Sequence, residues 1–232
     1  MAVKYFELPE IGKIGAYKRK GSRSIRVSVT DSGLVRVTLP NWVPYKTAIA
    51  FVQSKADWIA KQRQTSVSVL ENNQAIGKAH HLIFQPDSTV NRISSRIKGT
   101  EAIVIYPLTL RLQDNRVQTA AKAVSIRALR HEADNLLPKR LLTLASEHGL
   151  SYTSVNVRML KTRWGSCNSR SEITLNIFLM QLPWHLIDYV LLHELTHTKV
   201  MHHGPKFWKE FQLYLPDAQK LRKQIRSYKS TF

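Results

Sequence analysis

Cysteine is nearly absent from the sequence: Cys167 is the only one among 232 residues. A single cysteine cannot form an intrachain disulfide, which fits a reducing compartment. It also excludes a zinc site built mainly from thiolates, because such sites use two or more cysteine ligands. A metal site in this chain would therefore have to draw its ligands from histidine or carboxylate side chains.

The sequence also lacks long hydrophobic runs. Its longest apolar stretch, around residues 189–192, is bounded by Asp188 and His193 and is far shorter than the ~20 residues of a transmembrane helix. The N-terminal residues MAVKYFE lack the apolar core of a signal peptide. We therefore expect no membrane association and a cytoplasmic location.

Acidic residues are few relative to basic ones. The chain has 35 Lys and Arg against 16 Asp and Glu, a formal net charge of +19. Residues 1–118 carry 18 basic and 8 acidic residues and residues 119–232 carry 17 and 8, so the excess is not confined to a tail. A field of this sign attracts nucleic acid or other acidic partners. The alternative is that the charge serves only to keep the surface soluble.

The N-terminal half has the alternation of apolar and polar residues that is typical of strands. Residues 25–39 alternate on both sides of the turn sequence Asp31-Ser32-Gly33, which predicts a hairpin. Residues 45–63 instead carry an apolar stripe of helical period and predict one helix. Short apolar segments at 81–84 and 102–106 predict further strands.

From about residue 118 the pattern becomes mainly helical. Apolar residues recur at helical spacing over 120–145, which predicts a long helix or two shorter ones, kinked or broken at Pro138. Gly149 is expected to end this helical region. No internal repeat is evident in the sequence.

Two strands and three more helices complete the chain. We expect strands around 155–157 and 173–177, a helix after Pro183, and two further helices around 207–214 and 217–228. The sequence thus predicts an α+β fold. We divide it into a β-rich N-terminal part, residues 1–118, and an α-rich C-terminal part, residues 119–232.

The strongest chemical signal lies on the helix that follows Pro183. His193 and His197 are four residues apart and share one face of that helix, the spacing at which two imidazoles bind one zinc ion. Glu194 stands where a general base would act on a water at the metal. His203 is a candidate third ligand, and three protein ligands leave the fourth position open, as in catalytic zinc sites.

Several alternatives attach to this constellation. His202 could supply the third ligand in place of His203, and the histidines could simply be polar surface. Val200 stands where the metzincin motif requires a glycine, so the chain is not a metzincin. Cys167 could approach the zinc, although a free cysteine is more often a small buried hydrophobe.

The segments around this helix resemble those of the YgjP-like metallopeptidase family. The resemblance rests on an ordered set of motifs, which reads RWGSC at 163–167, ITLN at 173–176, IDYV at 187–190, HELTH at 193–197, His203, and Phe207-Trp208. It is dense from about 155 to 212 and looser in the N-terminal half. It implies a compact zincin-like α/β domain at 119–232 that hydrolyses peptide bonds.

Carried over residue by residue, the resemblance places the zinc ligands at His193, His197 and His203 and the general base at Glu194. The third ligand is assigned to His203 because His202 falls on an Asn of the family pattern. The family is also similar to SprT-type and WLM-type zinc proteases, which degrade proteins crosslinked to DNA. Together with the charge, this suggests nucleic-acid-associated substrates.

The sequence therefore predicts a cytoplasmic zinc metallopeptidase that acts on proteins or peptides. The alternative is a basic nucleic-acid-binding protein whose zinc site is not catalytic. Three further roles stay open at this point. Arg163 and Trp164 could line the substrate cleft or belong to a tight turn that Gly165 permits, and Asn176 could bond a substrate strand or a neighbouring loop.

Overall fold

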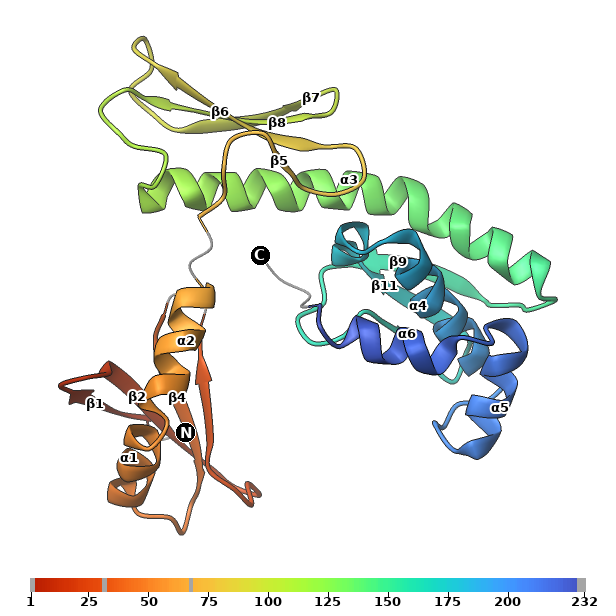
Figure 1. Cartoon of the computed structure of the whole chain (residues 1–232), viewed down its shortest axis with the longest axis horizontal. Helices are drawn as coiled ribbons and strands as arrows, with labels where there is room; N and C mark the ends of the chain where they lie inside the picture. Colours follow the sequence, from red (N-terminus) through yellow and green to blue (C-terminus); the bar gives the residue numbers. More distant parts are fainter. Residues whose placement is uncertain (1–2, 31–32, 67–68, 229–232) are drawn as a thin grey trace. The chain divides into compact units, whose positions relative to one another are not determined.

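The computed structural model describes residues 3–30, 33–66 and 69–228, and these form two compact units, Met1–Val69 and Leu70–Phe232. Both units combine sheet and helix, as the predicted α+β class requires (Figure 1). Residue 118, where the sequence suggested a division, lies inside a helix of the second unit. A functional division at that point stays a prediction. Within the described ranges, no helix is both long and apolar enough to cross a bilayer.

The first unit is a four-stranded sheet with two helices packed on one of its faces (Figure 1). The strand order is β1-β2-β4-β3, with β2 and β4 parallel and the two outer pairs antiparallel. Its core joins Val37 and Leu39 of the sheet to Val52 and Ile59 of the helices. The elements are β1 (Val3–Leu8), β2 (Gly12–Arg19), β3 (Arg26–Val29), β4 (Val35–Pro40), α1 (Tyr45–Gln53) and α2 (Ala56–Ser66).

The predicted hairpin is confirmed as β3 and β4, which pair with Val27 opposite Val37. Two residues of its predicted turn, Asp31 and Ser32, lie outside the described residues. The single helix expected over 45–63 is wrong, because the chain forms α1 and α2. The hydroxyl of Ser54 donates to the carbonyl of Phe51 at 2.8 Å, and this bond caps α1 before α2 begins.

Strands β1 and β2 were not predicted individually. Strand β1 shows no clear alternation of apolar and polar residues, since most of its residues are exposed. Strand β2 contains Gly12 and Gly15, which weaken the pattern typical of a strand.

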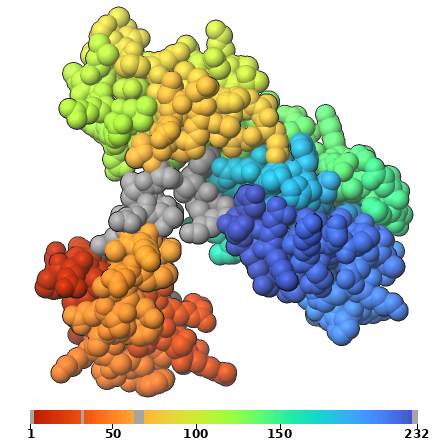
Figure 2. Space-filling view, in the orientation of Figure 1, coloured from red at the N-terminus to blue at the C-terminus, as the bar shows by residue number. Residues whose placement is uncertain are grey.

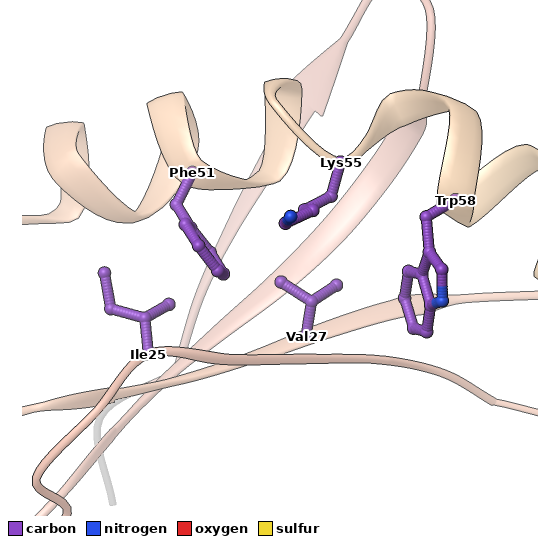
Figure 3. A pocket seen from close by; sticks show the side chains of 5 residues that line it. All are labelled: Ile25, Val27, Phe51, Lys55 and Trp58. Carbon is purple, nitrogen blue, oxygen red and sulfur yellow. The ribbon is translucent and has the colours of Figure 1, made fainter.

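The helices do not close completely over the β3 edge of the sheet. A pocket of about 270 Å³ remains there, lined by Ile25, Val27, Phe51, Lys55 and Trp58 (Figure 3).

The second unit begins with a sheet of the same strand order and directions as the first. The order is β5-β6-β8-β7, again with a parallel central pair and antiparallel outer pairs. The predicted strands at 81–84 and 102–106 are confirmed as parts of β6 and β8. The strands are β5 (Gln74–Ala75), β6 (His81–Asp87), β7 (Ser94–Lys98) and β8 (Glu101–Pro107).

One face of this sheet packs on α3 (Asn115–Glu147), a single helix of 33 residues. Side chains fill the space between sheet and helix (Figure 2). The helix continues through Pro138 and is bent rather than broken (Figure 1). It ends as predicted at Gly149, which has φ +60°, while the Leu150 N–H donates to the Ala145 carbonyl at 2.8 Å.

The rest of the second unit packs on the C-terminal half of α3. A three-stranded sheet of order β10-β11-β9 and four helical segments form this region. The predicted strands and helices are confirmed, apart from Ile177, which starts a 3₁₀ helix. The elements are β9 (Ser154–Arg158), β10 (Gly165–Cys167), β11 (Glu172–Asn176), η1 (Ile177–Gln181), α4 (Trp184–His197), α5 (Pro205–Tyr214) and α6 (Ala218–Ile225).

A buried carboxylate, Glu132, fastens the loop between β5 and β6 to α3. It accepts backbone N–H bonds from Lys78, Ala79 and His80 and a further bond from His80 Nδ1 at 2.7 Å. A Cβ at Gly77 would collide with the carboxylate, so the loop can approach only with glycine there. Burial alone raises the pKa of Glu132, but these hydrogen bonds outweigh it and leave the pKa below its ordinary value.

Replacement of Glu132 by Gln should lower the free energy of unfolding by about 2 kcal/mol, because buried N–H donors lose their charged acceptor. Urea denaturation measures the change, with Asp134→Asn on the exposed side of α3 as the matched control. A carboxyl group whose pKa is lower in the folded protein than in the unfolded chain stabilises the fold at pH values above its unfolded pKa. The difference between wild type and variant should therefore shrink as the pH falls below 4.5. Equal stabilities at neutral pH would contradict this role of Glu132.

Candidate metal centre

Helix α4 carries the first two histidines of the candidate site. It begins directly after Pro183, whose fixed φ suits the position before a helix, and most of its residues are buried. His193 and His197 lie one turn apart on the same face, as predicted from their spacing. Their Nε2 atoms are 3.2 Å apart.

The segment between α4 and α5 brings in His203. Helix α4 stops after His197, where the Thr198 hydroxyl donates to the Leu195 carbonyl at 2.8 Å. Helix α5 starts at Pro205 with Gly204 as its N-cap residue. The short connection turns back toward α4, and the Nε2 atom of His203 lies 2.8 Å from that of His193.

The three imidazoles form a group of the size that holds one metal ion. Their candidate ligand atoms all lie within 4.8 Å of one another. Tetrahedral zinc with Zn–N bonds of about 2.0–2.1 Å would separate its nitrogen ligands by about 3.3 Å, close to the two Nε2 distances observed. His202 is exposed and contributes no ligand atom to this group, and neither does Cys167.

The electrostatics keep the three imidazoles neutral, which is the form that binds metal. Burial lowers the pKa of His193 to about 3, with further lowering from His197, His203 and Arg222. Burial also lowers the pKa values of His197 and His203. At neutral pH each ring therefore offers a nitrogen lone pair.

Neighbouring groups hold the rings in place. His197 Nδ1 lies 3.1 Å from the Val200 carbonyl, which fixes the proton on Nδ1 and leaves the lone pair on Nε2. Phe207 of α5 is fully buried, and its ring centroid lies 4.6–4.9 Å from those of all three histidines. Phe207 is therefore part of the core and holds the His203 segment in place.

Glu194 lies beside the first histidine and is buried, with 5% of its surface exposed. Burial raises its pKa to about 8, and the positive charge of Arg163 acts in the opposite direction. Its side chain fits against β10 only because residue 165 is glycine. A Cβ there would lie 2.8 Å from the Cγ and Oε1 atoms of Glu194.

The glycine of the RWGSC motif therefore has a role that the sequence reasoning missed. One of the two alternatives for this segment was a tight turn that Gly165 permits, but the residue lies in a strand and has no positive φ. What it provides is space for the glutamate of the helix. A glycine inside a strand is a known sign of close approach by another group, and that was the available signal.

Asn176, which the sequence left between two roles, serves a neighbouring loop. Its buried side chain donates to the carbonyls of Leu160 and Arg163, each at 2.8 Å, and accepts from the Leu160 N–H at 3.3 Å. The loop before β10 is thereby fixed to the end of β11. Trp164 in that loop is partly buried against the core.

Two further contacts position the site and were not predicted. Asp188 of α4 accepts two bonds of 2.8 Å from Arg140 of α3, a bidentate ion pair that fixes α4 along the longer helix. Arg222 of α6 lies over the ring of Trp208, 4.5 Å from its centroid.

The thiol of Cys167 is half-buried, and burial together with Glu194 raises its pKa to about 11, so it is a poor metal ligand.

Two other histidines, His80 and His185, lie away from this site. His80 is buried in its bond with Glu132, and His185 is exposed near Gln224. A helix that carries two histidines and a glutamate, joined by a third histidine from the next segment, is the arrangement of a metallopeptidase site.

The chain belongs to the YgjP-like family of metallopeptidases. The sequence profile of the YgjP-like metallopeptidase domain matches residues 23–228, which span most of both units. The protein is therefore a metallopeptidase, as the sequence resemblance implied. No curated protein sequence matches the chain significantly.

Two solved structures show limited similarity. The crystal structure of the metallopeptidase zymogen of Pyrococcus abyssi abylysin is 24% identical over 40% of this chain and 93% of its own, with a TM-score of 0.37. That of Methanocaldococcus jannaschii jannalysin, also a metallopeptidase zymogen, is 19% identical over 39% of this chain and 94% of its own, with a TM-score of 0.35.

The geometry predicts different effects for two adjacent histidines. His203→Ala removes one of the three converging Nε2 atoms and should weaken zinc affinity at least ~100-fold. His202→Ala alters an exposed neighbour and should leave the affinity within about two-fold of wild type. Competition with a chromophoric chelator measures both constants. Equal losses in the two variants would show that His203 is not a ligand.

Proposed function

We propose that this metallopeptidase hydrolyses peptide bonds with a zinc ion held by His193, His197 and His203 and with Glu194 as the general base. The observation that carries the proposal is the position of Glu194: its carboxylate is buried beside β10, and the residue directly follows His193, one of three converging neutral imidazoles. Three imidazoles and no carboxylate are a donor set that suits zinc.

The reaction requires a proton to leave the attacking water and reach the leaving amine. When bound, zinc would supply a Lewis acid that acidifies water and polarises the scissile carbonyl. Glu194 accepts the water proton on a carboxylate oxygen and returns it to the amine nitrogen. Burial raises the pKa of this carboxylate, so its ionised form binds the water proton more strongly than an exposed carboxylate would.

Strand β10 is suited to align the substrate. It forms the edge of its sheet in the order β10-β11-β9, so one side of its backbone has no strand partner among the described residues. An extended peptide that paired with this edge would run past Gly165 and hence past Glu194. Arg163 is exposed two residues before Gly165, and its positive charge acts on Glu194.

Proteins bound to nucleic acid are the substrate class that we propose. The formal net charge of +19 is spread over both halves of the sequence and attracts polyanions. A peptidase with such a field would be concentrated near proteins held on nucleic acid. A purely nucleic-acid-binding role with a non-catalytic metal would leave the burial of Glu194 against Gly165 without a purpose.

Glu194→Gln separates the two functions. The variant keeps the shape of the side chain but cannot accept the water proton, so peptide cleavage should fall 10²–10⁴-fold while zinc content is unchanged. Glu147→Gln, at an exposed carboxylate in the last turn of α3, is the matched control and should retain activity. Cleavage of a casein digest and metal analysis supply the two readings. Undiminished cleavage by Glu194→Gln would overturn the assignment of the base.

Gly165→Ala tests the packing that positions the base. The added methyl group would lie within 3 Å of Glu194, so the carboxylate must move, and cleavage should fall about 100-fold with zinc affinity retained. Gly204→Ala provides the control, since a Cβ there meets no atom within 4 Å although the residue adjoins His203. Similar kcat/KM values for the two variants would contradict the proposed role of Gly165.

A further inference from the structure

The sheet of the first unit has two faces of opposite character. Ile14, Ala16, Val35, Val37 and Leu39 are buried under α1 and α2. Because side chains alternate along a strand, the residues between them lie on the other face. No described element of this unit packs there. A soluble sheet normally leaves such a face polar and mixed in charge.

This open face carries aromatic rings in place of a mixed polar surface. Tyr5 of β1 and Tyr17 of β2 border the same glycine: a Cβ at Gly15 would lie 3.4 Å from a ring atom of Tyr5 and 3.1 Å from one of Tyr17. Tyr5 is 57% exposed. Gly15 thus leaves room for two neighbouring rings on this face of the sheet.

Cations surround the two rings. The guanidinium of Arg36 lies 4.2 Å from the ring centroid of Tyr17, and the ammonium of Lys13 lies 5.0 Å from that of Tyr5. Arg26 of β3 is exposed on the same face, opposite Thr38 of β4. Among the strand residues of this face, Glu7 is the single acidic one.

The loop from β2 to β3 extends this surface into a basic hollow. The hollow has a volume of about 630 Å³ and no carboxylate in its lining. Hydroxyl and cationic groups alternate around it, a composition suited to phosphate oxygens. Its polar lining consists of Arg19, Lys20, Ser22, Arg23, Ser24, Arg26, Ser28 and Thr38.

We propose that this face binds single-stranded nucleic acid, with unpaired bases stacked on Tyr5 and Tyr17 and the phosphates in the β2–β3 hollow. Base stacking on aromatic rings beside a basic groove is how proteins bind single strands without sequence preference. A duplex keeps its bases stacked internally and would offer this face only phosphates. An acidic peptide would match the arginines but would gain nothing from the two neighbouring tyrosine rings, of which Tyr5 is exposed and Tyr17 is half-buried.

The inference extends the nucleic-acid partner proposed above and is independent of peptide hydrolysis. Strands β1 and β2, which supply both tyrosines, precede the residues matched by the family profile. Tyr5 and Tyr17 therefore lie outside the matched residues, whereas Arg26 and Arg36 lie within them. His193→Ala should lose cleavage and keep oligonucleotide binding, so that failure of one proposal leaves the other testable.

Fluorescence anisotropy with the full chain and a labelled oligo-dT of about 20 nucleotides tests the proposal, over a series of salt concentrations. Tyr5→Ala combined with Tyr17→Ala should weaken binding at least ~10-fold with an unchanged salt slope. Phe at both positions keeps the rings and should stay within about two-fold of wild type. Arg26→Gln combined with Arg36→Gln should reduce the slope of log K against log salt by about 0.7 for each lost phosphate contact.

Arg130→Gln combined with Lys139→Gln removes the same charge from exposed positions of α3 and serves as the control. It should change affinity by no more than about two-fold. Thermal unfolding of each variant establishes that the fold is retained. The proposal is overturned if the tyrosine-to-alanine pair binds as wild type, if a duplex binds as tightly as the single strand, or if polyglutamate of equal charge competes equally.

Discussion

The close approach of α4 to strand β10 is the contact on which the candidate site depends. The histidine spacing determines which face of the helix holds a metal, but it does not determine where the carboxylate of Glu194 goes. That carboxylate is confined between its own helix and a strand that has no side chain at Gly165. The Arg140–Asp188 ion pair and the Phe207 ring then hold the helix and the third histidine against this contact.

The features that could be predicted from the sequence are those that depend on residues close together in the chain. The i, i+4 histidines, the alternation in β3 and β4, and the left-handed Gly149 each depend on residues a few positions apart. The sequence could not predict contacts between distant segments, such as Arg140 with Asp188, 48 residues away. It also could not distinguish a glycine needed for space from one needed for a turn.

The two four-stranded sheets share strand order and strand directions although the sequence shows no repeat. Their buried faces need only apolar residues at alternate positions, which many sequences satisfy, so topology can recur without sequence similarity. Their outer residues are free to differ. The first sheet presents Tyr5, Tyr17 and Arg36, a combination visible only once β1, β2 and β4 are placed side by side.

The length of α3 has a consequence for the cooperativity of the second unit. At 1.5 Å per residue its 33 residues span about 50 Å, and its buried row runs without interruption from Val117 to Ala145. The N-terminal part of that row is covered by one sheet and the C-terminal part by α4 and β9. If either half of the unit unfolded, it would expose the apolar surface of α3, and the other half needs the same helix for its own core. The stability of the metal-binding half therefore depends in part on a sheet that contributes no ligand to it.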